Sequence, residues 1–142
     1  MSTREANAEE YVEILRFYAR QMNLLDRLDL DGYAGTFTPD GVTHHVHHGT
    51  ELEGRDALLA HARKALPRYR EVTARHWNDH YLVDVAPDGV LHVGYTSLVT
   101  VTDAEGQVRF ESTFAVTDEL VRQEGRLFTR SRTIVRDRPA SG

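Results

Sequence analysis

Asp26 and His76 are the residues whose types and positions best fit chemistry by proton transfer. Asp26 lies beside the apolar stripe of an amphipathic N-terminal segment, where a carboxylate needs a partner. His76 stands in the strand-like run Arg75–Asn78, and imidazole exchanges a proton readily near neutral pH. The pair predicts a general base, His76, oriented by Asp26 in one pocket. The structural alternatives are an aspartate exposed in a loop and a core histidine bonded to a backbone carbonyl.

Side chains on the face of His76 complete the predicted pocket. Asn78 shares its strand face and can donate to a ligand oxygen. Ser112, which lies between Phe110 and Phe114, can do the same. We expect the two rings to share the face of Ser112 and to supply an apolar wall.

The histidine-rich run His44–His48 raises the question of a metal site. Residues four apart on a strand are about 13 Å apart, so only His45 and His47, about 6.6 Å apart, can share an ion. That pair lacks a clear third ligand, and its parity points away from the pocket, so no metal is expected. The sequence also lacks a glycine-rich phosphate loop, so no nicotinamide or flavin cofactor is expected. His44, on the other face, is expected in the pocket, with a solvent-exposed imidazole as the alternative. Tyr33 is the tyrosine most expected to touch ligand.

Composition restricts the class of partner. The 17 Lys and Arg against 22 Asp and Glu give a net charge of −5, which disfavours nucleic acid and anionic membranes. The arginines from Arg122 to Arg138 alternate with acidic residues and are expected on a solvated strand face. The sequence contains no cysteine, which excludes disulfides and thiolate chemistry. A small, neutral molecule is therefore the expected ligand.

Length and the first residues bear on organisation. With 142 residues, the chain is expected to form one domain over 1–142, with a core at about 8–136 and a flexible tail at 137–142. The start is polar and acidic and contains no apolar segment of signal-peptide length, which predicts a cytoplasmic protein.

Hydrophobic periodicity predicts helices first and strands afterwards. Helical spacing runs from Ala8 to about Leu28, a short helix capped by Asp29 follows, and a third helix is expected over Asp56–Leu66, ending before Pro67. A turn at Thr38–Gly41 leads to a strand over Val42–His47. Four longer strands are expected over Glu71–Val85, Val90–Thr102, Val108–Val121 and Arg126–Val135. This order predicts an α+β domain with a curved, mostly antiparallel sheet wrapped around three helices.

The order of elements and four motifs resemble the SnoaL-like branch of the nuclear transport factor 2-like superfamily, over about residues 8–136. The motifs are Phe17–Asp26, Thr36–Val42, Glu53–Leu58 and Arg75–Trp77. The resemblance implies a cone-shaped α+β barrel with a deep pocket between helices and sheet, and often a dimer through the outer sheet surface. It extends to proteins of aromatic polyketide pathways and, more distantly, to scytalone dehydratase. Asp26 and His76 match that enzyme's helical Asp and strand His by motif order, whereas Leu25 replaces the Tyr before the Asp.

The expected function is a cofactor-independent dehydratase or cyclase, a lyase acting on a small aromatic polyketide. His76 would remove a proton next to a carbonyl, and Asp26 would stabilise the imidazolium. Two alternatives remain: a non-catalytic binding or oxygenase-associated subunit, and an epoxide hydrolase. One Asp-His pair in the pocket favours dehydration or cyclisation, two or more carboxylates around an Arg favour epoxide opening, and a sealed cavity favours the non-catalytic role.

A homodimer through the sheet is also expected. Trp77, Tyr81 and Val83 are predicted to alternate away from the face of His76 and to form an apolar outer surface that needs covering.

Overall fold

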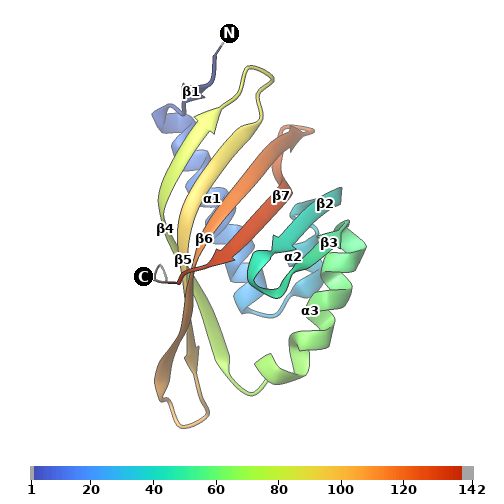
Figure 1. The fold of residues 1–142 in the computed structure, drawn as a ribbon, viewed down its shortest axis with the longest axis vertical. Coiled ribbons are helices and arrows are strands. Elements are labelled where there is room, and N and C mark those ends of the chain that lie inside the picture. Colours follow the sequence, from blue (N-terminus) through green and yellow to red (C-terminus); the bar gives the residue numbers. More distant parts are fainter. Residues whose placement is uncertain (1, 139–142) are drawn as a thin grey trace.

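The computed structural model describes residues 2–138 and consists of helices packed against one large sheet (Figure 1). The helices are α1 (Ala8–Asp26), α2 (Leu30–Ala34) and α3 (Arg55–Tyr69), with a short 3-10 helix, η1 (Val46–His48). The strands are β1 (Arg4–Glu5), β2 (Phe37–His45), β3 (Thr50–Glu53), β4 (Thr73–Val85), β5 (Leu91–Thr102), β6 (Val108–Gln123) and β7 (Arg126–Arg136). The predicted α+β class, the three helices and the four long strands are confirmed.

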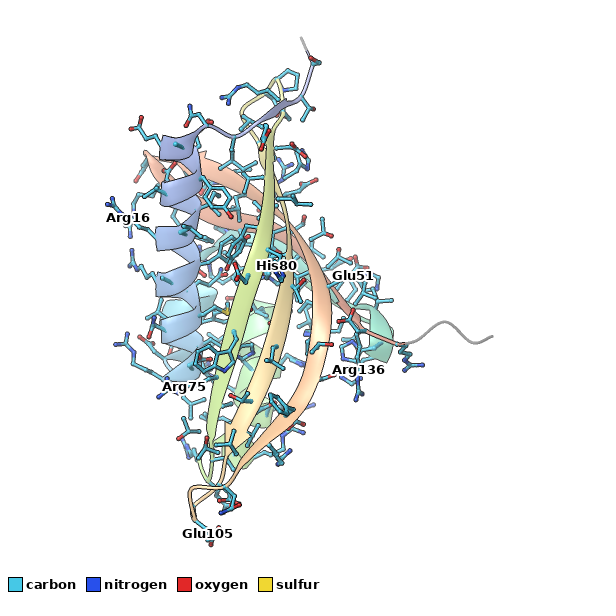
Figure 2. All side chains as sticks on the ribbon, turned by 90° about the vertical axis from the view of Figure 1, so that its left-hand side faces the viewer. Arg16, Glu51, Arg75, His80, Glu105 and Arg136 are labelled. Carbon is cyan, nitrogen blue, oxygen red and sulfur yellow. The ribbon has the colours of Figure 1, made fainter. Side chains whose placement is uncertain are left out.

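The sheet has seven strands in the order β1-β4-β5-β6-β7-β2-β3. Every neighbouring pair is antiparallel except β2 and β7, which are parallel. The two outermost strands, β1 and β3, are not paired with each other, so the curved sheet stays open and does not close into a barrel. We call the face that α1 covers the inner face (Figure 2).

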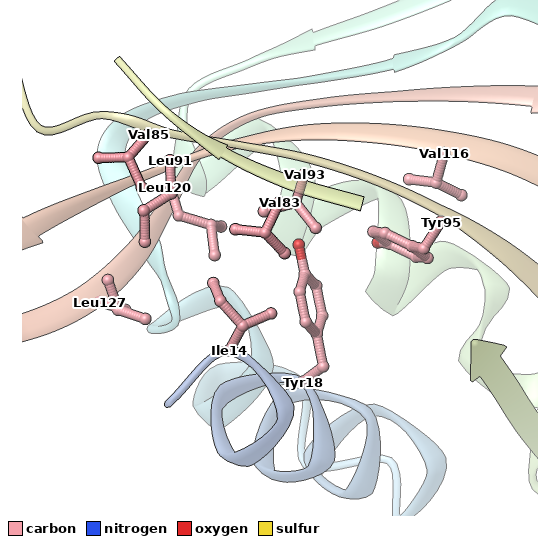
Figure 3. Packing of buried hydrophobic residues seen from close by; sticks show 10 residues of the cluster. All are labelled: Ile14, Tyr18, Val83, Val85, Leu91, Val93, Tyr95, Val116, Leu120 and Leu127. Atoms are coloured by element: carbon pink, nitrogen blue, oxygen red, sulfur yellow. The ribbon is translucent and has the colours of Figure 1, made fainter. Parts of the chain in front are cut away.

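The main core lies between α1 and the inner face. Asn7 caps α1 by accepting from the Glu10 N–H, and Glu10 accepts from the Asn7 N–H in return, which fixes where the helix begins. Ile14 and Tyr18 then point onto the sheet and pack among buried aliphatic side chains of β4, β5, β6 and β7 (Figure 3). Helical spacing on α1 and alternation on the strands therefore supply the two halves of one core.

Two predicted breaks in the chain are wrong. Thr38–Gly41 lies inside β2, where the pairing with β7 shifts register between Phe37 and Val42, so it forms an irregularity within a strand. A Cβ on Gly41 would lie 3.1 Å from the Thr38 carbonyl oxygen, so glycine fits this close approach best. Pro67 lies inside α3, near its C-terminal end, and does not stop the helix.

A bulge at His80 changes which side chains of β4 face inward. Asp79 pairs with Thr96 and Leu82 pairs with Gly94, so β4 contains one extra residue over this interval. His80, which Figure 2 labels, lies at this bulge. It adopts a φ of 60°, a left-handed conformation that histidine tolerates better than most residues. The predicted outward positions of Tyr81 and Val83 are therefore wrong: both pack in the inner core.

The predicted C-terminal tail is only partly covered by the structure. Asp137 is held against β6, because its N–H donates to the Thr113 carbonyl at 3.0 Å and its carboxylate accepts from the Thr113 hydroxyl at 2.7 Å. Residues 139–142 lie outside the described residues.

Candidate active site

Asp26 and His76 lie in direct contact. The Asp26 Oδ1 atom is 2.7 Å from Nδ1 of His76, and Oδ2 accepts the backbone N–H of His76 at 3.1 Å. A carboxylate is an acceptor only, so Nδ1 carries a proton, and in the neutral ring the lone pair is on Nε2. The His76 side chain is 28% exposed and that of Asp26 13% exposed, so a ligand can reach the imidazole while its carboxylate partner stays largely shielded.

The sheet edge explains why the two residues meet. β1 pairs with β4 only at Asp84 and Val85, so the edge of β4 is unpaired near His76. Asp26, the last residue of α1, satisfies the free N–H there. A carboxylate at a helix C-terminus is unfavourable by about 0.3–1 kcal/mol, because the helix dipole is negative at that end. Asp26 thus occupies a locally poor position that is offset by its contacts with His76.

The turn after Asp26 is also constrained. Leu28 adopts a φ of 63°, which is costly for a residue with a branched side chain. The Leu28 and Asp29 N–H groups donate to carbonyls of Leu25 and Leu24, both at 2.9 Å. These bonds hold the end of α1, and with it Asp26, against the sheet.

Strand register places three of the predicted neighbours on the inner face with His76. His76 is in register with Val99 and, through it, with Ser112, while Asn78 is in register with Ser97 and Phe114. Residues in register on neighbouring strands project to the same face. The Oδ1 atom of Asn78 is buried without a hydrogen-bond partner among the described residues, so it is suited to bind a ligand.

Phe110 does not share this face, contrary to the prediction. A bulge in β6 brings Phe110 opposite Thr100, whereas Ser112 is opposite the preceding residue, Val99. The hydroxyl of Thr100 accepts from the indole N–H of Trp77, which marks this side as the outer face. Phe110 is 77% exposed and cannot supply a wall to the site.

His44 also faces away from the inner side, contrary to the prediction. Thr43 pairs with Arg132 on β7, and both are buried on the inner face. His44, the next residue, therefore projects outward, and His45 projects inward toward α3. The alternation within β2 was predicted, but the choice of which face meets the core was wrong.

Tyr33 lies in a buried polar network and does not line the site. Its hydroxyl accepts from Nη1 of Arg132 at 2.9 Å, and its side chain is 7% exposed. Arg132 also donates to both Asp118 oxygens, at 3.0 and 2.9 Å, and to Gln21 at 2.6 Å. The prediction of a wholly solvated arginine face is thus wrong at Arg132, which is 3% exposed.

Asp118 is the acceptor at the centre of this network. Its Oδ2 atom accepts the hydroxyls of Tyr18 and Tyr95 at 2.7 and 3.1 Å. Burial raises the pKa of both tyrosines well above the ordinary value, and the nearby Asp118 charge adds to the effect, so both remain donors. Burial is the largest single influence on Arg132 and lowers its pKa, but the charge and hydrogen bond of Asp118 together with Tyr95 and Tyr33 outweigh burial, so the pKa is raised.

Sequence reasoning missed the network, although one signal was present. Asp118 alternates with Val116 and Leu120, both of which are buried, so its parity places a carboxylate in the core. A buried carboxylate needs a cation or several donors, which directs attention to the arginines of β7.

An open depression of about 480 Å³ adjoins His76. Its walls are His76, Trp77, Asn78, Asp79, His80, Thr96 and Leu98, so it borders residues of both sheet faces. This surface differs from the deep pocket between helices and sheet that the resemblance implied.

Two further classes of feature are absent from residues 2–138. No cluster of three or more His, Asp or Glu side chains is arranged to hold a metal ion there. None of the helices in this range combines the length and the apolar character needed to cross a bilayer.

Comparison with known proteins identifies relatives over nearly the whole chain. The model of the SnoaL-like domain matches residues 6–133. Aln2 from a Streptomyces species is 42% identical, with a TM-score of 0.90 over 94% of this chain and 95% of that one. ActVI-ORFA from Streptomyces coelicolor is 34% identical, with a TM-score of 0.86 over 92% and 98% of the two chains.

A third solved structure contains a ligand. The protein from Catenulispora acidiphila in complex with S-DNPA is 34% identical, with a TM-score of 0.84 over 92% of this chain and 96% of that one. A search of curated proteins finds no match.

Proposed function

The chain belongs to the SnoaL-like family, and from that premise we propose that it is a cofactor-independent dehydratase or cyclase of aromatic polyketides. The observation that carries the proposal is the 2.7 Å contact between Asp26 and Nδ1 of His76, which leaves Nε2 free on a partly exposed ring. The ligand-bound relative from Catenulispora acidiphila supports a small-molecule ligand. The resemblance described above supports the polyketide class.

The proposed reaction begins with proton removal. Nε2 of His76 takes the proton from the carbon next to a substrate carbonyl, the C–H electron pair moves into the carbonyl, and an enolate forms. The imidazolium is stabilised by the Asp26 carboxylate as it develops. Asn78, whose buried Oδ1 has no partner among the described residues, lies two residues along the same face and is placed to orient the substrate.

The second step returns the proton. In dehydration, the enolate electrons expel the β-hydroxyl group, which takes the proton from His76 and leaves as water. Oxygen-ring closure instead starts from neutral His76 and needs no prior C–H deprotonation: a substrate hydroxyl adds to a carbon conjugated to a carbonyl, His76 takes the hydroxyl proton, and the imidazolium delivers that proton to the neighbouring carbon. Both reactions use the same two side chains and return them to their starting state.

The partners of the buried arginine and of Asp26 argue against epoxide opening. That reaction was expected to need two or more carboxylates around an arginine. Arg132 contacts one carboxylate, Asp118, and both side chains are buried and hydrogen-bonded within the core. Asp26 is bonded to His76 instead.

Deuterium exchange tests the first step directly. A naphthalene-based β-hydroxy ketone incubated with the protein in heavy water should gain deuterium next to its carbonyl and form the unsaturated ketone. His76→Ala should lose both reactions. His92→Ala is the matched control, since His92 is 44% exposed and contacts Glu119, away from the dyad. Exchange at the wild-type rate in His76→Ala would refute the proposal.

We also propose a homodimer through the outer sheet face. Trp77, Leu82 and Phe110 are 57%, 75% and 77% exposed, and register places them on this face. A second copy of the chain would cover this apolar surface. Light scattering should give twice the mass of the 16.1 kDa chain, and Phe110→Glu should reduce it to the monomer mass. A monomeric wild-type protein at micromolar concentration would contradict the dimer.

A further inference from the structure

Four histidines that the dyad does not use gather where β2, η1 and α3 meet. The rings of His45 and His61 stack with centroids 5.4 Å apart and planes 28° apart. The rings of His47 and His48 lie 6.1 and 6.2 Å from that of His45. The described residues contain no three-ligand metal cluster, so we look to hydrogen bonding for the role of these imidazoles.

Two nitrogens in this group are unsatisfied. Nδ1 of His45 and Nδ1 of His47 are buried and have no hydrogen-bond partner among the described residues. Buried polar atoms in folded proteins are nearly always paired. Oδ1 of Asn78, which faces inward from β4 beside the dyad, is in the same condition.

A row of side chains on the inner face connects the dyad to the histidines. Asn78, Ser97 and Phe114 are in register on β4, β5 and β6. Neighbouring strands are about 4.8 Å apart, so this row spans about 10 Å. The ring of Phe114 then lies 5.5 Å from that of His47. The row is partly aromatic and polar at both ends, which suits a molecule of fused rings with oxygens at both ends.

We propose that His45, with His47 and His61 beside it, forms a second polar subsite that binds a phenol or ketone oxygen at the substrate end distant from the dyad. This inference rests on the proposed function for the identity of the substrate as an aromatic polyketide. It adds that the substrate carries an uncharged oxygen at both ends of its ring system.

The chemistry of the subsite selects uncharged oxygens. Burial, together with the nearby His61 and His47, lowers the pKa of His45 to about 4, so its ring is neutral at neutral pH. A neutral imidazole has one donor and one acceptor nitrogen, which matches the O–H and lone pairs of a phenol. A carboxylate would find no fixed positive charge on this ring.

A pair of probes measures the subsite without turnover. 2,6-Dihydroxynaphthalene has an oxygen at each end, whereas 2-naphthol has one. Wild-type protein should bind the diol about five- to tenfold more tightly than 2-naphthol, the range for one added hydrogen bond. His45→Phe keeps a ring of similar shape but removes both nitrogens, and the affinity ratio should fall to about two, the statistical factor for two equivalent oxygens. His92→Phe is the control and should keep the wild-type ratio.

A second measurement avoids substitution. In wild-type protein with labelled histidines, titration with the diol should shift the nitrogen resonances of both His45 and His76. An unchanged affinity ratio in His45→Phe, shifts confined to His76, or no measurable binding of the diol would each overturn the subsite. Failure of the proposed function is separate, because it appears as retained exchange activity in His76→Ala, whatever the affinity ratio.

Discussion

The protein contains two groups of hydrogen-bonded side chains, each centred on a carboxylate, and the two groups differ in burial. Asp118 and Arg132 are 1% and 3% exposed, and three tyrosines and a glutamine form further hydrogen bonds with them. Asp26 bonds to the ring and to the backbone N–H of His76 at the sheet edge, and the ring is partly exposed, with no partner for Nε2 among the described residues. A buried network of this kind can hold the fold, but its polar atoms are shielded from a substrate. We therefore expect the dyad to carry the chemistry of the proposed function and the network to contribute mainly to stability.

Breaking the dyad should give the largest effect on activity. Asp26→Ala and His76→Ala should each lower turnover by about 10²- to 10⁴-fold, and the double variant should be little worse, because the two act as one unit. The free energy of unfolding should change by only about 1 kcal/mol, since the pair is partly exposed. Steady-state rates and urea denaturation measure the two quantities. Additive losses in the double variant would show that the residues work separately.

Breaking the network should give the largest effect on stability. Asp118→Ala should lower the free energy of unfolding by about 3–5 kcal/mol, because it leaves the Arg132 charge buried without a partner. Urea denaturation measures this loss. Glu119→Gln, which removes the charge of an exposed partner of Arg130, should cost about 1 kcal/mol or less and is the control.

Replacing Asp118 and Arg132 together tests whether the loss of stability comes from an unpaired buried charge. Asp118→Leu with Arg132→Met removes both charges together, so the double variant should be more stable than either single one. A double variant as unstable as the sum of the singles would mean that the network contributes more than charge pairing.

Alkaline pH should lower the stability that the buried tyrosines around Asp118 and Arg132 contribute. Burial raises the pKa of Tyr18, Tyr33 and Tyr95 in the folded state. Stability from these groups is full below the unfolded tyrosine pKa of about 10 and is lost as pH rises toward the higher folded values. Thermal unfolding followed above pH 10 should show a steep decline that Tyr95→Phe makes shallower. Equal slopes in the two proteins would contradict the assignment.

The smallest expected effect concerns metal removal. The dyad needs no ion for the proposed proton transfers, so exhaustive dialysis against a chelator should leave turnover within error of the untreated protein. Loss of activity that added zinc restores would point to a metal-assisted reaction and away from the dyad.

The sequence was sufficient for those features that depend on local pattern. The spacing of α1 and the length of the four long strands follow from hydrophobic periodicity, and the helix capped by Asp29 follows from side-chain chemistry. The pairing of Asp26 with His76 was predicted from an unfavourable carboxylate position together with the family resemblance. Its catalytic role stays a prediction.

The strand residues that were assigned to the wrong face were misplaced for two reasons, the choice of face and inserted residues. Alternation tells which residues share a face, but it cannot tell which face meets the core, and His44 was misplaced for that reason. Phe110 and Tyr81 were misplaced because a bulge adds one residue to the strand. Bulges depend on pairing with strands that are distant in the sequence, so a local sequence pattern does not predict them.

The extra residue at His80 reverses the alternation of inward and outward side chains along β4. Before it, the even-numbered residues His76 and Asn78 face inward; after it, the odd-numbered residues Tyr81 and Val83 do. Deleting His80 would leave Tyr81 and Val83 facing the core. It would turn His76, the proposed base, to the outer face and Trp77 to the inner face. A single-residue deletion could thus convert the protein into an inert but folded scaffold, which makes this bulge a place where a lineage could lose its chemistry in one genetic step.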